Sequence, residues 1–162
     1  MPKAEPATAE GFSAARVVKD IEVISQEHHS VAHPAERARV REYLVERLNG
    51  FGADTVKLFG YDSLVGPQNK HVEYTFDAVN ILAEFAPEEA TDSTSYLMFV
   101  AHYDSRYSQP MPKKDTVWSY GAADDGYGIG VALETVSLAL KQKAEWRQSG
   151  RYMWKTSLHL SS

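Results

Sequence analysis

The spacing of apolar residues along this chain predicts three helices. The first begins after Ser13, a suitable N-cap residue, and the second begins at Pro34, because proline is favoured in a first helical turn. The third follows Gly126. In each segment apolar residues recur at the spacing of one helix face, namely Ala15, Val18, Ile21 and Ile24, then Val40, Tyr43, Leu44 and Leu48, then Ile129, Leu133, Val136 and Leu140.

Four other segments have the shorter patterns of strands. Residues 53–60 alternate between polar and apolar, which predicts a half-exposed strand, and residues 71–85 predict a second strand region in which Asp77 marks a bend or bulge. Residues 96–101 form an unbroken apolar run, which is typical of a strand covered on both faces, in a sheet with helices on each side. Residues 151–160 alternate, which favours a half-exposed last strand over a central one.

The order of these elements predicts the fold class. Two helices, three strands, a helix and a strand indicate a three-layer α/β/α domain with a mixed, partly parallel sheet. A chain of 162 residues is long enough for one such domain and too short for two. We expect a disordered lead-in over residues 1–11, which are rich in Pro, Ala, Glu and Thr, a folded domain over 12–148, and a separate tail over 149–162.

Composition excludes several classes of function. A net charge of −5 argues against a nucleic-acid partner, which requires clustered Lys and Arg. The chain has no cysteine, so disulfides and thiolate metal sites are excluded. No apolar stretch approaches the roughly 20 residues of a membrane span, and the N-terminal residues show no signal-peptide pattern.

The candidate chemistry lies at the end of the apolar run and at the start of the third helix. His102 and Asp104 follow the run, at the strand end where open α/β sheets bind ligands. A neutral imidazole is a good zinc ligand, and a neighbouring carboxylate can fix its tautomer. Asp124 and Asp125 lie at the helix entrance among small residues that leave room for an ion. The alternatives are an ordinary strand-end histidine and two helix-capping carboxylates, but two acidic residues exceed what capping needs.

Four other polar residues are candidates of lower rank. The histidines at 28, 29 and 33 could bind a metal ion, but the interpretation preferred here places them on the surface of a loop, with His33 fixing the entry to the second helix. Glu134 in the third helix is predicted to be a solvated or packing residue.

The paired motifs at 100–105 (VAHYDS) and 121–128 (GAADDGYG) together resemble those of the co-catalytic zinc aminopeptidases. That family includes secreted leucyl aminopeptidases, glutamate carboxypeptidases, glutaminyl cyclases and endoplasmic-reticulum metallopeptidases, of which the last are the most similar. The resemblance covers about residues 12–148 and implies a zinc exopeptidase-like fold.

The resemblance also implies a role for each motif residue. His102 matches the first zinc ligand, Asp104 the carboxylate that orients it, and Asp124 the aspartate that bridges two zinc ions. The bond from Asp124 to Asp125 is implied to be cis. Two zinc ions then activate a water that attacks the carbonyl of the N-terminal peptide bond, so the implied partner is a peptide or protein N-terminus. The family also implies an extracytoplasmic or membrane-associated location.

The remaining residues of the family's site have no counterpart in this sequence. The family has an adjacent Glu-Glu pair, which holds the general base, then an aspartate and a histidine, but no Glu-Glu pair follows Gln148 here. We therefore expect a frame change or truncation near Gln148, and a 162-residue chain that is inactive by itself. A glutaminyl cyclase on the same fold and a non-catalytic binding module remain the alternatives.

Overall fold

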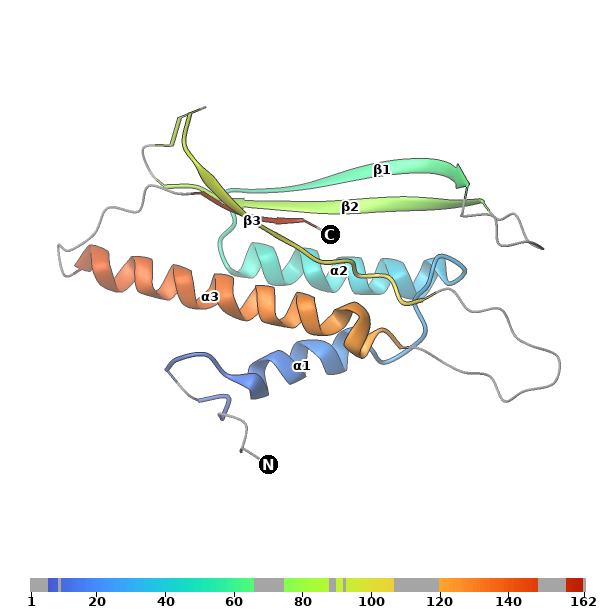
Figure 1. Ribbon diagram of the computed structural model, residues 1–162, viewed down its shortest axis with the longest axis horizontal. Coiled ribbons are helices and arrows are strands. Elements are labelled where there is room, and N and C mark those ends of the chain that lie inside the picture. Colours follow the sequence, from blue (N-terminus) through green and yellow to red (C-terminus); the bar gives the residue numbers. More distant parts are fainter. Residues whose placement is uncertain are drawn as a thin grey trace.

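The computed structural model describes residues 6–8, 10–65, 75–87, 90–91, 93–106, 120–148 and 157–161. Its helices are α1 (Ala14–Ile24), α2 (Pro34–Gly50) and α3 (Tyr127–Gln148), and a short kinked turn, η1 (Ala122–Gly126), leads into α3 (Figure 1). Its strands are β1 (Thr55–Val65), β2 (Thr75–Phe85), β3 (Tyr96–Val100) and β4 (Ser157–Ser161). Within these residues, no helix has both the length and the apolar character needed to cross a membrane.

The four described strands form one mixed sheet in the order β1-β2-β4-β3. β1 and β2 are antiparallel, β2 and β4 are antiparallel, and β3 and β4 are parallel, so the predicted mixed, partly parallel sheet is confirmed. The prediction that the last strand is not central is wrong, because β4 pairs with a neighbour on each side. Alternation in a sequence reports which side chains share a face, whereas backbone pairing decides a strand's position in the sheet.

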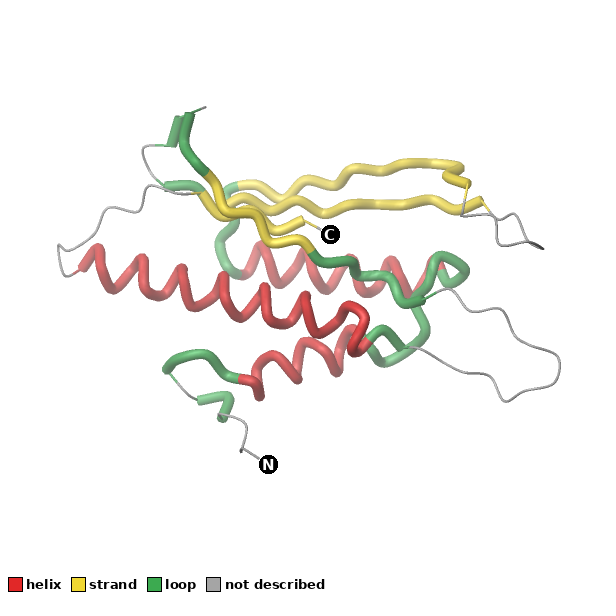
Figure 2. The backbone as a smooth tube through the Cα atoms, viewed as in Figure 1, coloured by secondary structure: helices red, strands yellow, loops and turns green. Residues whose placement is uncertain are grey.

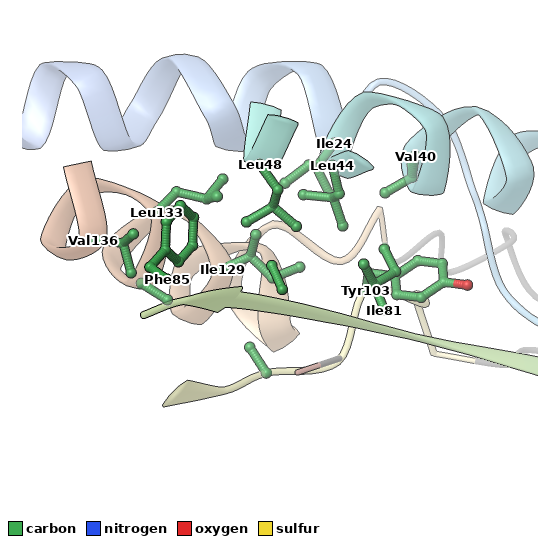
Figure 3. Close-up of a cluster of buried hydrophobic side chains, with 13 residues drawn as sticks. Ile24, Val40, Leu44, Leu48, Ile81, Phe85, Tyr103, Ile129, Leu133 and Val136 are labelled. Atoms are coloured by element: carbon green, nitrogen blue, oxygen red, sulfur yellow. The ribbon is translucent and has the colours of Figure 1, made fainter. Parts of the chain in front are cut away.

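The hydrophobic core lies between the sheet and the helices. All three described helices lie on one side of the sheet, with α2 and α3 nearer the strands and α1 beyond them (Figure 2). Side chains from α2 and α3 meet side chains of β2 in the core (Figure 3). The largest fully buried apolar side chains are Ile24, Leu48, Ile81, Leu133, Val40 and Val136.

Strand β3 differs from its predicted environment. We expected the apolar run 96–101 to be covered on both faces, but Tyr96 is 61% and Val100 is 71% exposed. Phe99 packs against the core, so its neighbours Met98 and Val100 face the other side of the sheet, where no described helix lies. β3 is also an edge strand among the described residues, which adds to its exposure.

The N-terminal helix is held by hydrogen bonds at its start. Ser13 caps α1 as predicted, its hydroxyl accepting from the backbone N–H of Arg16. Arg16 in turn donates to the backbone carbonyls of Ala7 and Gly11, at 2.6 Å each, within the predicted lead-in. Val18, expected on the apolar face, is 47% exposed, because Val17 occupies the position that packs against α3.

The predicted irregularity at Asp77 is confirmed. The β1–β2 register shifts between Tyr61 and Leu64, and Asp77 lies opposite the shift. Its carboxylate accepts the backbone N–H of Ser63 at 3.0 Å, and Ser63 has a positive φ of 55°. The side chain therefore stabilises the backbone where the strand pairing is interrupted.

Candidate metal centre

His102 and Asp104 lie in the loop that directly follows β3. His102 Nδ1 is 3.0 Å from the backbone oxygen of Asp104 and 3.3 Å from its carboxylate oxygen Oδ1. A carbonyl oxygen can only accept, so Nδ1 must carry the proton in this contact. This leaves Nε2 as the ring atom available to a metal ion.

Asp124 lies in the turn η1, at the entrance to α3. Its carboxylate oxygen Oδ1 is 3.0 Å from His102 Nε2, so the fold brings together the strand-end histidine and the helix-start aspartate. The turn begins at Gly121, whose positive φ of 71° is a conformation that glycine adopts readily. Its carbonyl accepts the backbone N–H of Gly126 at 2.8 Å. The Asp124–Asp125 peptide bond is cis, as the sequence resemblance implied.

Asp125 takes a capping role at the same turn. Its Oδ1 accepts the backbone N–H of Gly128 at 3.0 Å, which satisfies one of the free donors at the start of α3. A Cβ at Gly128 would clash with that same oxygen, so a glycine there leaves room for the carboxylate to cap the helix. Asp125 thus supports the turn, and Asp124 keeps its carboxylate, which is 75% exposed, toward His102.

The electrostatics of the pair favour positive charge on the ring. Burial of the imidazole acts to lower the pKa of His102, but the hydrogen bonds to Asp124 and Asp104 outweigh burial and raise the pKa above its usual value. A protonated ring can donate from both nitrogens to the two oxygens that face it. A divalent cation at Nε2 would replace the proton there and satisfy the same carboxylate.

The two residues fit zinc in donor type and spacing. Imidazole nitrogen and carboxylate oxygen are both zinc ligands, and two ligands of a tetrahedral zinc with bonds of about 2.0–2.1 Å lie about 3.3 Å apart. The observed 3.0 Å between Nε2 and Oδ1 is close to this separation. Within the described residues, no group of three or more His, Cys, Asp or Glu side chains is arranged to hold a metal ion. His102 and Asp124 are therefore the protein ligands that the described part of the chain offers.

Two buried histidines near this pair were predicted from the sequence to lie on the surface. His28 and His29, predicted to be surface residues, are 5% and 1% exposed, and both contact Ser105. His33 lies at the N-cap of α2 as expected, where its Nδ1 is 3.0 Å from the Ser30 hydroxyl. A polar loop with three histidines carries no local sign of burial, because burial here depends on a residue 76 positions away.

For Glu134 the structure decides between the two predicted alternatives, a solvated and a packing residue. Glu134 is 4% exposed and forms an ion pair with Arg16 at 2.6 Å. Its carboxylate also accepts the backbone N–H of Ser13 at 2.9 Å. Glu134 is thus the packing residue that the other interpretation allowed, and it ties α3 to the start of α1.

Comparisons with known proteins show which family and which solved structures the chain resembles. Residues 80–154 match the family described as peptidase family M28. A comparison of the sequence with curated proteins finds no match. Among solved structures, the chain is similar to a leucine aminopeptidase precursor from Bacteroides thetaiotaomicron, with a TM-score of 0.70 and 21% identity over 93% of this chain and 46% of the other.

Two further structures extend the likeness. A glutaminyl cyclase from Porphyromonas gingivalis has a TM-score of 0.71 and 23% identity, over 94% of this chain and 48% of its own. A protein described as a putative zinc-dependent exopeptidase from Bacteroides vulgatus has a TM-score of 0.63 and 20% identity, over 97% and 49%. The chain thus spans under half the length of these structures. Over residues 80–154 the chain therefore resembles peptidase family M28, and its fold is similar to that of a leucine aminopeptidase precursor and of a glutaminyl cyclase.

Proposed function

We propose that this chain contributes to a zinc-dependent exopeptidase of the aminopeptidase type, which hydrolyses the N-terminal bond of a peptide. The observation that carries the proposal is the contact between His102 Nε2 and Asp124 Oδ1 at 3.0 Å, with Nδ1 of the same ring held by Asp104. The match to an M28 peptidase family over residues 80–154 supports the same reaction class.

Each residue has a distinct part in the proposed site. His102 Nε2 would be a terminal ligand to one zinc ion, and the exposed carboxylate of Asp124 has two oxygens, enough to bridge two ions. Asp104 holds the ring from its Nδ1 side, and Asp125 fixes the turn by capping α3. When bound, zinc supplies Lewis-acid polarisation of the scissile carbonyl and lowers the pKa of a water molecule.

We expect the 162-residue chain to be inactive when it is alone. Two protein ligands are fewer than a catalytic zinc site uses, which is typically three for one ion. The two other carboxylates beside the pair are already engaged, because Asp104 holds the ring of His102 and Asp125 caps α3, so no described residue of the site is left to act as the general base.

The first experiment measures zinc binding by the full chain with isothermal titration calorimetry. We expect weak binding that His102→Ala and Asp124→Asn each abolish. His33→Ala and Asp77→Asn are the matched controls, since both residues lie outside the pair and should leave binding unchanged. Equal zinc affinity in His102→Ala and in the unmodified chain would refute the assignment of the metal centre.

The second experiment measures turnover of aminoacyl-nitroanilides with added zinc. We expect no turnover above the zinc-only control, because the described residues offer no general base beside the pair. Sustained hydrolysis that His102→Ala eliminates would keep the zinc exopeptidase assignment and disprove the expected inactivity.

Glutaminyl cyclisation is the second candidate, favoured by the likeness to the Porphyromonas gingivalis glutaminyl cyclase. In that reaction the α-amino group of an N-terminal glutamine attacks its own side-chain amide carbonyl, and ammonia leaves. The same polarised-carbonyl chemistry serves both reactions, so His102 and Asp124 do not discriminate between them. Ammonia release from a glutaminyl peptide, without hydrolysis of aminoacyl-nitroanilides, would favour the cyclase.

A further inference from the structure

The peptide unit that joins Asp104 to Ser105 is held from both sides. Its carbonyl oxygen, which belongs to Asp104, accepts from His102 Nδ1 at 3.0 Å. Its N–H, which belongs to Ser105, points to the backbone oxygen of His29 at 3.4 Å. Because a peptide unit is planar, the direction of the N–H fixes the direction of the carbonyl oxygen. The backbone of His29 therefore influences where the acceptor for His102 lies.

A second contact fixes the same peptide through the side chain of Ser105. The Ser105 hydroxyl oxygen accepts the backbone N–H of His29 at 3.0 Å and lies 3.3 Å from His28 Nδ1, to which its proton can be donated. Ser105 is 0% exposed and His29 is 1% exposed, so water does not compete for these hydrogen bonds. Burial also lowers the pKa of His29, which keeps its ring uncharged in this position.

The same buried residues pack against the turn that carries Asp124. A Cβ built on Gly121 would lie 3.2 Å from the Ser105 Cβ, 3.3 Å from His29 Cε1 and 3.4 Å from the backbone oxygen of Asp124. The start of the turn thus lies directly against His29 and Ser105. Any shift of these two residues would move both partners of the His102–Asp124 contact.

We propose that Ser105 and the backbone of His29 are positioning residues, which orient His102 and the Asp124 turn for metal binding by holding the Asp104–Ser105 peptide. This proposal deepens the proposed function and rests on it for the identity of the metal. The side chain of Asp104 is then one of two groups that hold the ring, and its backbone carbonyl, at 3.0 Å, is the nearer.

The test compares zinc binding by the full chain with that of Ser105→Ala, measured by isothermal titration calorimetry. We expect the alanine variant to bind zinc about 10-fold more weakly, the lower end of the range for partners that orient a metal ligand. Ser105→Thr keeps the hydroxyl and should restore binding. Ser25→Ala is the matched control: the Ser25 hydroxyl is buried, makes no hydrogen bond in the described structure, and should change affinity less than 2-fold.

A second readout needs no metal. The rate at which the His102 Nδ1 proton exchanges with water, measured by NMR on the metal-free chain, reports its hydrogen bond to Asp104. We expect exchange to be several-fold faster in Ser105→Ala and unchanged in Ser25→Ala. Urea unfolding of each variant shows whether it is folded, and Ser105→Cys, which preserves the side-chain shape, replaces the alanine variant if that one unfolds.

The outcomes separate the two proposals. If the unmodified chain binds zinc and a folded Ser105→Ala chain binds it equally well, the positioning role is wrong while the metal centre stands. If the unmodified chain binds no zinc, the proposed function fails. The proton-exchange rate then decides whether Ser105 positions His102, and equal rates in both chains would overturn that role.

Discussion

Replacing Glu134 tests how much the tie between α1 and α3 stabilises the fold. The Glu134 carboxylate accepts from Arg16 Nε at 3.0 Å and from its terminal nitrogen at 2.6 Å, and it also accepts the backbone N–H of Ser13. The carboxylate is 4% exposed, so its loss leaves both donors in a place that water reaches poorly. We therefore expect Glu134→Ala to destabilise the chain.

The loss of stability in Glu134→Ala depends on which hydrogen-bond partners Arg16 keeps. Removing one partner of a buried ion pair typically costs about 3–5 kcal/mol. The Arg16 side chain is 28% exposed and keeps two backbone carbonyl acceptors, so solvent and those carbonyls offset part of this cost. We expect Glu134→Ala to lose about 2–3 kcal/mol, and Glu134→Gln about 1–2 kcal/mol because its amide oxygen can still accept from Ser13.

Urea unfolding followed by circular dichroism gives the free energies of unfolding. Glu145→Ala is the control on the same helix, because Glu145 is 60% exposed, lies 4.0 Å from Lys141, and should change stability by less than about 0.5 kcal/mol. A Glu134→Ala loss no larger than that of Glu145→Ala would show that the ion pair does not stabilise the native state.

The pH dependence gives a second test of the same ion pair. Burial acts to raise the pKa of Glu134, but the hydrogen bonds from Arg16 and Ser13 outweigh it and lower the pKa. A lowered pKa means that the stabilisation is present above the unfolded value of about 4.3 and is lost as the pH falls further. The difference in the free energy of unfolding between Glu134→Gln and the unmodified chain should therefore shrink from pH 5 to pH 3. A difference that stays constant over this range would show that the ionised Glu134 carboxylate is not the source of the stabilisation.

Three further predictions concern the core, the turn and a buried hydroxyl. Leu133 is 0% exposed, so Leu133→Ala should lose about 3–4 kcal/mol in urea unfolding, and a loss below about 1 kcal/mol would mean that the core closes around the gap. Gly128→Ala would place a Cβ against Asp125 Oδ1 and displace that capping carboxylate, so it should cost about 1 kcal/mol and weaken zinc binding, and unchanged affinity would show that the cap does not position the site. Tyr43→Phe removes the hydroxyl bond to buried Asp20 and should cost about 1 kcal/mol. Burial and that bond raise the pKa of Tyr43, so the stability that its hydroxyl contributes should be lost as the pH rises beyond about 10. If Tyr43→Phe and the unmodified chain unfold with the same midpoint in alkaline solution, this prediction is wrong.

The positions of the site residues in their elements were predictable because their determinants are local. His102 and Asp104 follow a strand, and Asp124 and Asp125 begin a helix, so strand and helix patterns alone place all four at the ends of their elements. The contact between His102 and Asp124, which lie 22 positions apart, was implied by the resemblance to the zinc aminopeptidases and not by the local patterns. Capping by Ser13 was predictable from local pattern, because it depends only on the next three residues.

The histidines that were predicted to lie on the surface, and Glu134, for which two alternatives stayed open, have partners that are distant in the sequence. Glu134 lies 118 positions from Arg16, and His29 lies 76 positions from Ser105, so no window of local pattern contains both members of either pair. Strand β4 was assigned the wrong place in the sheet because pairing on two sides leaves no mark in its alternation. The apolar run of β3 predicted a strand correctly, but its environment depends on which elements cover it.

At the candidate metal centre the ligand side chains are exposed, whereas the residues that hold their backbone segments are buried, and this difference affects the affinity for a metal ion. The side chains of His102 and Asp124 are 49% and 75% exposed, so a metal ion reaches them without any opening of the fold. Exposed side chains lose conformational freedom when they bind, and this loss weakens binding unless other groups already restrict them. Here Ser105 and Gly121, both buried, fix the two backbone segments from which the ligands extend. Substitutions in the buried supports should therefore weaken metal binding without removing a single ligand atom.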